Sequence, residues 1–170
     1  AQGVGIIGTY HSKVDEAQAL AAEIERSGGK AAMLQLDVGD AASFDAFVAK
    51  VAELLPAHFG RERLDFLLNN AGIGIHASFA DTTEAQFDQL TKLHFKGPFF
   101  LTQKLLPLIA EGGRILNVSS GLARFALPGY GAYAAMKGAM EVLARYQAKE
   151  LGARGISVNI LPPGAIETAY

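Results

Sequence analysis

The chain has 170 residues, of which 50% are hydrophobic and 19% are charged, and this is enough for one domain with a sizeable core. A net charge of -2 and the absence of any run of Lys or Arg argue against nucleic acid or an anionic membrane as the main partner, which leaves small-molecule chemistry. There is no cysteine, signal-like segment or apolar run of about 18 residues, so disulfides and thiolate sites are excluded and we expect a soluble, cytoplasmic protein.

Apolar runs and the residues between them predict strands that alternate with helices. The segment 4–10 is a short apolar run that predicts the first strand. Ser12 and Asp15 have the spacing of a capping box that would open a helix, and Gly28 with Gly29 would end it.

The later elements follow the same alternation. In chain order we expect a strand at 31–36, a helix at 40–55, a strand at 64–68, a helix at 83–106, a strand at 114–118, a helix at 131–151 and a strand at 156–161. Thr83 and Gln86 would form a second capping box, and Pro98 should bend the helix that follows. Strands that alternate with helices predict an α/β domain whose parallel sheet is covered on both faces.

Polar or glycine-rich residues follow each of the five predicted strands. These segments are 9–12, Asp37-Val38, 69–72, Ser119-Ser120 and Pro163-Gly164. Ligands of parallel sheets bind beyond the carboxyl ends of the strands. Solvated loops explain one or two such segments but explain five poorly, so we expect a ligand site at this edge.

Tyr133 and Lys137 are four residues apart in the predicted helix 131–151, so both side chains lie on one helical face. An ammonium beside a phenol favours the phenolate, which lets the tyrosine exchange protons near neutrality. An exposed structural pair has the same spacing, and the pair alone does not decide between the two. Ser119 and Ser120 add two hydroxyls fourteen and thirteen residues upstream of Tyr133.

Together these residues resemble the short-chain dehydrogenase/reductase family, in particular its 3-oxoacyl-carrier-protein reductase-like members, over nearly the whole chain. The motifs that carry the likeness are Asn69-Asn70-Ala71-Gly72, Ser120, Tyr133-x-x-x-Lys137, Asn159, and Pro163-Gly164 with Thr168. The resemblance implies a three-layer, Rossmann-type, doubly wound parallel sheet. It also implies hydride transfer between a nicotinamide cofactor and a carbonyl or secondary alcohol, in a homodimer or homotetramer.

The resemblance also implies roles for individual residues. Tyr133 would be the general acid in reduction, Lys137 would assist it and reach the nicotinamide ribose, and Ser120 would donate a hydrogen bond to the substrate oxygen. Ser119 would be structural, although the two serines could be reversed. His94 stands where the family usually has the asparagine of a proton relay, so it is either a relay group or a core histidine.

The resemblance further implies cofactor contacts by Asp37, Val38, Asn70, Ala71, Gly72, Pro163, Gly164, Ile166 and Thr168. No acidic residue ends the first strand to bond a ribose 2'-hydroxyl. Thr9, His11 and Ser12 supply hydroxyls and an imidazole that suit a 2'-phosphate, so NADP(H) is favoured over NAD(H). Ser12 could instead be only a helix cap. Asn69 and Asn70 could form a turn that bonds its own backbone, which is compatible with the cofactor contacts.

An apolar mouth is expected beside Ser120 and Tyr133, suited to a hydrophobic or acyl-like carbonyl compound. Its predicted lining is Ile73, Gly74, Leu122, Phe125 and Tyr130. Two alternatives stay open: a non-catalytic cofactor-binding or assembly protein of the same fold, and a serine hydrolase. The hydrolase would use Ser120, although the surrounding sequence lacks the Gly-x-Ser-x-Gly elbow.

The family's glycine-rich phosphate loop is not found in this sequence. Gly3, Gly5 and Gly8 imitate its spacing, but they precede a strand and would not open a helix. We therefore expect residues 1–170 to form a single, incomplete domain that lacks the family's first strand and final strand. The sequence would then be part of a longer protein, because the missing first strand would lie between the strands at 4–10 and 64–68 and its loss leaves backbone groups unpaired.

Overall fold

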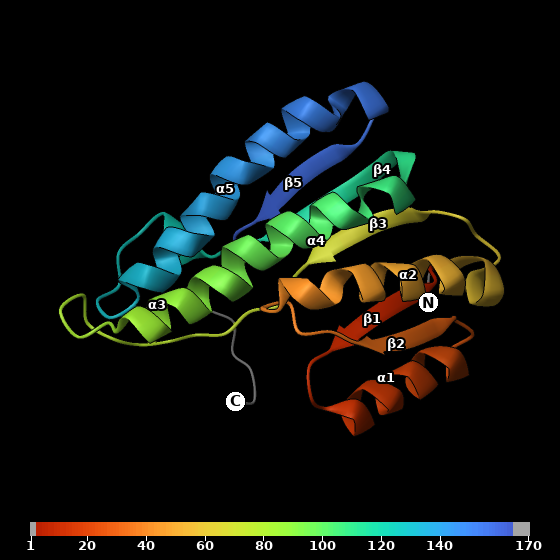
Figure 1. Ribbon diagram of the computed structural model, residues 1–170, viewed down its shortest axis with the longest axis horizontal. Helices are drawn as coiled ribbons and strands as arrows, with labels where there is room; N and C mark the ends of the chain where they lie inside the picture. The colour runs from red at the N-terminus through yellow and green to blue at the C-terminus, as the bar shows by residue number, and fades with distance from the viewer. Residues whose placement is uncertain (1–2, 165–170) are drawn as a thin grey trace.

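The computed structural model describes residues 3–164, and its strands and helices alternate as predicted (Figure 1). The strands are β1 (Ile6–Tyr10), β2 (Ala31–Gln35), β3 (Leu64–Asn69), β4 (Ile109–Val118) and β5 (Ser157–Leu161). The helices are α1 (Val14–Arg26), α2 (Phe44–Leu54), α3 (Glu84–Thr91), α4 (Gly97–Leu105) and α5 (Gly131–Leu151). Within the described part of the chain, no helix combines the length and hydropathy that a membrane crossing requires.

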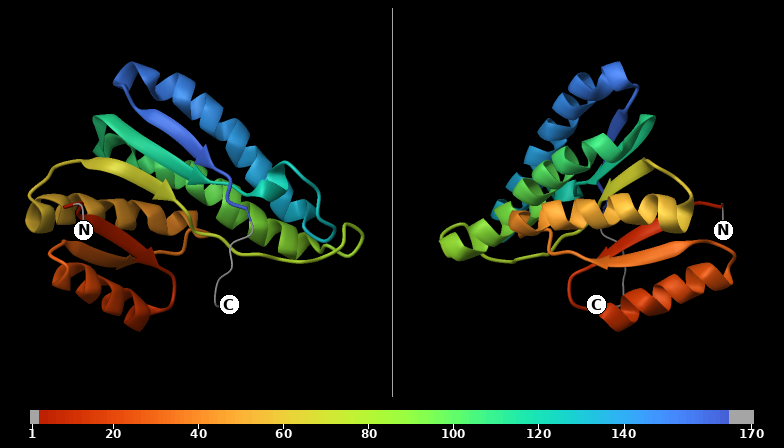
Figure 2. Two further views of the ribbon diagram at one scale, coloured as in Figure 1. Left: turned by 180° about the vertical axis from the view of Figure 1, so that it is seen from behind. Right: turned by 45° about the vertical axis from the view of Figure 1, so that its right-hand side comes forward.

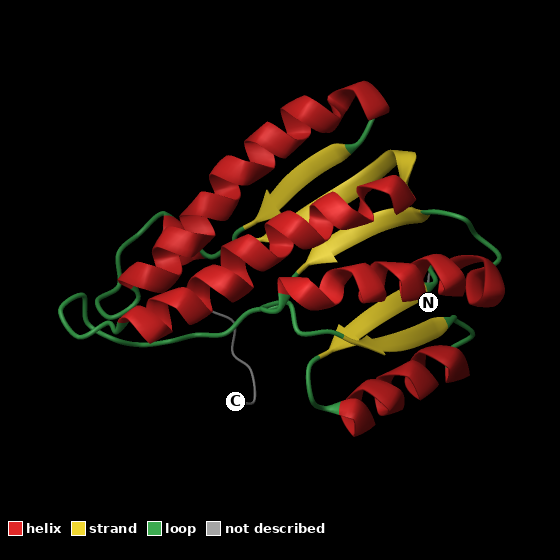
Figure 3. Cartoon of the chain, viewed as in Figure 1, coloured by secondary structure: helices red, strands yellow, loops and turns green. Residues whose placement is uncertain are grey.

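The strands form two parallel sheets. β1 pairs with β2, and β4 lies between β3 and β5 in a second sheet. β1 is the strand of the first sheet that lies nearer β3, but the two do not pair (Figure 3). The α/β class and the parallel pairing are confirmed, and the boundary between the sheets falls where the sequence predicted an absent strand.

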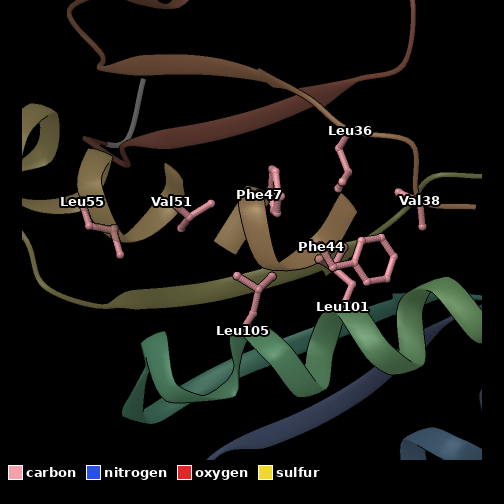
Figure 4. Close-up of a cluster of buried hydrophobic side chains, with 8 residues drawn as sticks. All are labelled: Leu36, Val38, Phe44, Phe47, Val51, Leu55, Leu101 and Leu105. Carbon is pink, nitrogen blue, oxygen red and sulfur yellow. The ribbon is translucent and has the colours of Figure 1, made fainter. Parts of the chain in front are cut away.

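An apolar cluster between α2 and α4 connects the two sheets (Figure 4). It contains Leu36, Val38, Phe44, Phe47, Val51, Leu55, Leu101 and Leu105. Leu36 and Val38 follow β2, whereas Leu101 and Leu105 belong to the helix that precedes β4. Full burial of one such side chain stabilises the fold by roughly 1.5–3 kcal/mol. At this boundary the two sheets are therefore held together by helix packing and not by strand pairing.

Helices α3, α4 and α5 lie on one face of the β3–β4–β5 sheet (Figure 2). On the opposite face, Phe66 and Leu68 of β3 are 58% and 59% exposed. Among the described residues this sheet is therefore covered on one face, whereas the sequence predicted two. The prediction arose because the strands alternate with helices, a pattern typical of parallel sheets that are covered on both faces.

Only one of the two predicted capping boxes forms. Thr83 Oγ1 accepts a hydrogen bond from Gln86 N at 3.2 Å, and Gln86 Oε1 accepts one from Thr83 N at 2.9 Å. The prediction that Ser12 caps α1 is wrong, because Lys13 occupies the cap position and no side chain caps that helix. The neighbouring Glu16 forms an ion pair with Lys13 at 2.9 Å.

The long helix predicted at 83–106 is interrupted by a π turn at Lys92–Lys96. Pro98 lies just beyond this turn, and a proline ring crowds the carbonyl of the residue four positions earlier, which here is His94. The interruption leaves His94 in the turn between α3 and α4. The described chain also has a second π turn at Leu55–Phe59 and four 3-10 turns at Ala41–Ser43, Leu106–Leu108, Gly121–Ala123 and Gly152–Arg154.

Candidate active site

The carboxyl ends of β4 and β5 bring two predicted segments together. Ser119 N donates to Leu161 O at 2.8 Å, and Gly121 N donates to Pro163 O at 2.9 Å. Parallel pairing of β4 with β5 continues in this way into the loops that follow both strands. The segment containing Ser120 therefore lies beside the Pro163 segment, as the sequence predicted.

Tyr133 and Lys137 lie one turn apart on α5. Lys137 is buried, its Nζ donates to Val118 O at 2.9 Å, and this nitrogen lies 5.7 Å from the centre of the Tyr133 ring. Burial lowers the pKa of the Lys137 ammonium below its ordinary value. Lys137 thus holds a cation beside the Tyr133 phenol. Solvent and ligands can reach this phenol, because Tyr133 is only half-buried.

The two serines have different surroundings. Ser119 is buried, and its Oγ can donate a hydrogen bond to Lys137 O, at 3.2 Å, or to Glu141 Oε1, at 3.1 Å. Ser120 is half-buried, and its Oγ accepts a hydrogen bond from Leu122 N at 3.2 Å. A hydroxyl that accepts from the backbone keeps its own hydrogen for donation, so Ser120 can donate to a ligand.

His94 is buried between the loop that follows β3 and the first turn of α5. Its Nε2 lies 2.8 Å from Ile73 O and 3.2 Å from Ile73 N, and its ring meets the Tyr133 ring edge-on at 5.2 Å. A Cβ on Gly72 would lie 2.8 Å from His94 Cε1, so the loop packs closely on the imidazole. The pKa of His94 is lowered from 6.5 to about 4, first by burial and second by the nearby Lys137 cation.

The neutral imidazole leaves one ring nitrogen without a partner. A single nitrogen can either donate or accept, so Nε2 satisfies Ile73 O or Ile73 N but not both. In either tautomer Nδ1 is buried and, within residues 3–164, makes no hydrogen bond. Such orphaned polar atoms are rare and call for an explanation.

A polar network crosses the sheet beneath these loops. Asn69 Nδ2 donates to Thr102 Oγ1 at 3.0 Å and to Asn117 Oδ1 at 2.8 Å. Asn117 is fully buried and donates in turn to Gln147 Oε1 at 3.1 Å. The side-chain amide of Asn69 thus donates to two other elements, α4 and β4. The network connects α4 and α5 through paired positions of the two strands.

The predicted cofactor residues of the first sheet lie together at its carboxyl end. His11 Nε2 lies 3.7 Å from Asp37 Oδ2, and Gln35 Nε2 donates to His11 O at 2.9 Å. Thr9, His11 and Ser12 are exposed. Val38 differs from the others, because its side chain belongs to the apolar cluster between α2 and α4. Its backbone carbonyl packs against Gly97 at the start of α4.

The residues that were predicted to line a mouth lie on the loops that follow β3 and β4. Ile73, Leu122 and Tyr130 are half-buried, Gly74 is exposed, and Phe125 is 59% exposed. His76 was not predicted in this group, although its ring meets Tyr130 edge-on at 5.1 Å. No local sequence signal marks His76, because the contact joins two separate loops. Asn70, Ala71 and Gly72 are exposed, whereas Ile166 and Thr168 lie outside the described residues.

Comparisons with known proteins identify the family of this chain. A family model described as "Enoyl-(Acyl carrier protein) reductase" matches residues 1–170. A probable tetrahydroxynaphthalene reductase of Zymoseptoria tritici is 32% identical over 169 residues, which are 98% of this chain and 61% of that protein. The chain thus spans about three fifths of the length of the curated relatives it matches.

Solved structures are also similar to this chain. The angucycline C-6 ketoreductase LanV with bound NADP superposes with a TM-score of 0.87 and 35% identity, over 91% of this chain and 60% of that one. A blue fluorescent protein from a metagenomic library, in complex with NADPH, gives a TM-score of 0.89 and 33% identity, over 98% of this chain and 66% of that one.

Proposed function

Because this chain belongs to the short-chain dehydrogenase/reductase family, we propose that it carries the catalytic residues of an NADP(H)-dependent oxidoreductase acting on a carbonyl or secondary alcohol. The observation that carries the proposal is the half-buried Tyr133 phenol beside the buried Lys137 ammonium, with the Ser120 hydroxyl on the adjoining strand end. The alternatives, a non-catalytic relative and a serine hydrolase, need no such pairing.

In this proposal Tyr133 gives its proton to the substrate oxygen during reduction and takes it back during oxidation. Ser120 donates a hydrogen bond to the same oxygen, where negative charge develops. The nicotinamide cofactor supplies or accepts the hydride when bound. Lys137 holds positive charge next to the phenol, and its lowered pKa makes it a readier proton donor than an exposed lysine.

We propose that His94 continues this proton path. Its Nδ1 has no partner in the described chain, and the Lys137 cation is close enough to lower its pKa. A neutral imidazole can accept a proton on one nitrogen and donate from the other, which a relay requires. The other interpretation, a core histidine held only by Ile73, leaves the unpaired nitrogen unexplained.

The residues at the strand ends fit the chemistry of a dinucleotide. Exposed backbone at Asn70, Ala71 and Gly72 would approach the adenosine ribose, and Asp37 would lie at the adenine. The exposed His11 and Ser12 support a 2'-phosphate, because Ser12 makes no helix cap that would occupy its hydroxyl. NADP or NADPH in the similar structures supports the same preference.

The substrate would be a small molecule with an apolar body. Ile73, Leu122, Phe125 and Tyr130 give the proposed mouth its apolar and aromatic surface. Similar proteins named for tetrahydroxynaphthalene and for an angucycline support a ketone of this kind.

Replacing Tyr133 with Phe tests the reaction. Without the phenolic hydroxyl no proton reaches the substrate oxygen, so kcat for NADPH-dependent ketone reduction should fall by at least about 100-fold. NADPH binding, followed by nucleotide fluorescence, should remain. Tyr146→Phe, on the exposed side of the same helix, is the matched control and should keep its turnover. Full activity in Tyr133→Phe would contradict the mechanism.

Cofactor choice is tested by titrating NADPH and NADH against fluorescence and thermal stability. We expect NADPH to bind more tightly. The double change His11→Ala with Ser12→Ala should weaken NADPH binding by at least about tenfold and NADH binding much less, because the loss of one hydrogen bond to a charged group costs about 1.5–3 kcal/mol and about 1.4 kcal/mol is a factor of ten. Ser27→Ala, at the other end of α1, is the control. Tighter binding of NADH by the unmodified protein would overturn the preference.

A further inference from the structure

We infer that His76 and Tyr130 together form a recognition wall that selects a planar aromatic ketone as the substrate of the site at Tyr133. This inference rests on the proposed function and deepens it by assigning a substrate class and a specificity-determining residue. It starts from a contact between two loops that the strand-end motifs do not include.

The contact joins residue 76, on the loop after β3, to residue 129, on the loop after β4. Ala77 N donates to Gly129 O at 2.9 Å, so the two backbones are tied together. Gly129 has φ +88°, and a Cβ at this position would collide with the His76 ring. The imidazole therefore lies directly on the backbone of Gly129, and its position is fixed by that glycine.

The ring of His76 begins a series that ends at the buried part of the site. His76 meets Tyr130 at 5.1 Å and 73°, and Tyr130 meets Tyr133 at 6.4 Å and 73°. Tyr133 meets His94 at 5.2 Å and 85°. All three contacts are edge-to-face, an arrangement that aromatic rings prefer. His76 thus lies at the outer end of the series, where the Tyr130 ring connects it to Tyr133.

The outer end is open to ligands. His76 is exposed, whereas His94 at the inner end is buried. Phe125, on the same loop as Tyr130, is also exposed, at 59%. A side chain that served only to fill the space over Gly129 would have no need of an exposed aromatic face.

The aromatic side chains at this end favour substrates that are flat and aromatic. The exposed rings of His76 and Phe125 and the half-buried ring of Tyr130 can pack against a flat aromatic substrate edge-on or in offset stacks, which a saturated ring of the same skeleton cannot match. The His76 nitrogens can also exchange a hydrogen bond with a phenolic oxygen. Planar aromatic ketones are therefore favoured over aliphatic ones.

The test compares 2-tetralone with 2-decalone, which share a bicyclic skeleton but differ in aromaticity. In the full-length protein with NADPH, the ratio of kcat/KM for 2-tetralone to that for 2-decalone should exceed one and fall about fivefold in His76→Leu. His76→Phe should restore most of the ratio, because the ring is retained. His58→Leu is the control, since His58 is another exposed histidine that meets a phenyl ring edge-on at 4.8 Å.

A second measurement separates this inference from the proposed reaction. Binding of 2-naphthol and of decahydro-2-naphthol is measured by calorimetry, which needs no turnover. We expect 2-naphthol to bind more tightly than decahydro-2-naphthol, and His76→Leu and Gly129→Ala to weaken its binding. This result would support the recognition role of His76 and Tyr130 even if neither ketone is reduced and the proposed reaction fails. Equal binding of the two alcohols, or an unchanged tetralone-to-decalone ratio in His76→Leu, would overturn the inference.

Discussion

His94 illustrates how much a single residue contributes to the proposed site. It contacts the loop at Ile73 and the ring of Tyr133, and the Lys137 cation acts on its charge. Burial keeps it neutral at physiological pH, because its pKa is about 4. The same burial makes the stability of the folded chain sensitive to acid. In the unfolded chain His94 takes up a proton at a higher pH than it does in the folded chain.

The sign of this effect can be tested. His94 binds fewer protons in the folded state, so stability is fully present above pH 6.5 and is lost as pH falls towards 4. The pKa difference corresponds to a loss on the order of 3 kcal/mol. In His94→Gln this part of the pH dependence of the free energy of unfolding should vanish, as measured by urea unfolding from pH 7 to pH 4. His58→Gln is the exposed control, and equal slopes in both variants would contradict the prediction.

The kinetics of the same variant distinguish a relay group from a core histidine. If His94 relays protons, His94→Gln should lower kcat and change its pH profile, whereas KM for the ketone should change little. A core histidine would affect stability without moving the pH profile of turnover.

At the scale of elements, α1 and α3 differ in how they begin. Both sequences carry a serine or threonine with an acid or amide three residues later, yet only Thr83 and Gln86 form the reciprocal bonds. At α1 the cap position falls on Lys13, one residue beyond Ser12. Local spacing thus suggests a capping box without fixing the residue at which the helix starts.

This difference gives a paired prediction. Thr83→Ala removes a side chain that accepts from Gln86 N, so the free energy of unfolding should fall by about 1 kcal/mol. Ser12→Ala should change it by less than about 0.5 kcal/mol, because no helix bond is lost. Both are measured by urea unfolding at pH 7. A larger loss in Ser12→Ala than in Thr83→Ala would show that the assigned caps are wrong.

At the scale of the whole molecule, packing between α2 and α4 holds together two sheets that share no strand pairing. Apolar side chains also remain on the outer surface of the helices beside the second sheet. Phe99 and Phe100 on α4 are each 37% exposed, and Val142 and Tyr146 on α5 are 45% and 64% exposed. We propose that these residues form the interface of the homodimer or homotetramer that the family resemblance implies.

Light scattering on the purified chain tests this assembly. The unmodified chain should have at least twice the monomer mass, and Tyr146→Glu should reduce that mass, because a charge at an apolar interface loses its hydration. Leu20→Glu is the control, since Leu20 is a 52% exposed apolar residue on α1, away from α4 and α5. A monomer in the unmodified chain would exclude this interface.

The sequence by itself determined the order of the elements and the residues of the proposed reaction. Strand and helix periods are local, so they placed Tyr133 and Lys137 on one face of a helix and the polar segments beyond the strands. The start of β4 was predicted five residues too late, at 114, whereas the strand begins at Ile109 and includes Gly112 at φ +73°.

Only the tertiary structure decided which groups meet. The unpaired nitrogen of His94, the bond from Lys137 to Val118 O and the contact of His76 with Gly129 all join segments far apart in the chain. The division into two sheets is likewise a matter of which strands lie within hydrogen-bonding distance. Such contacts depend on how the elements pack, and hydrophobic periodicity specifies which face of an element is buried but not what it is buried against.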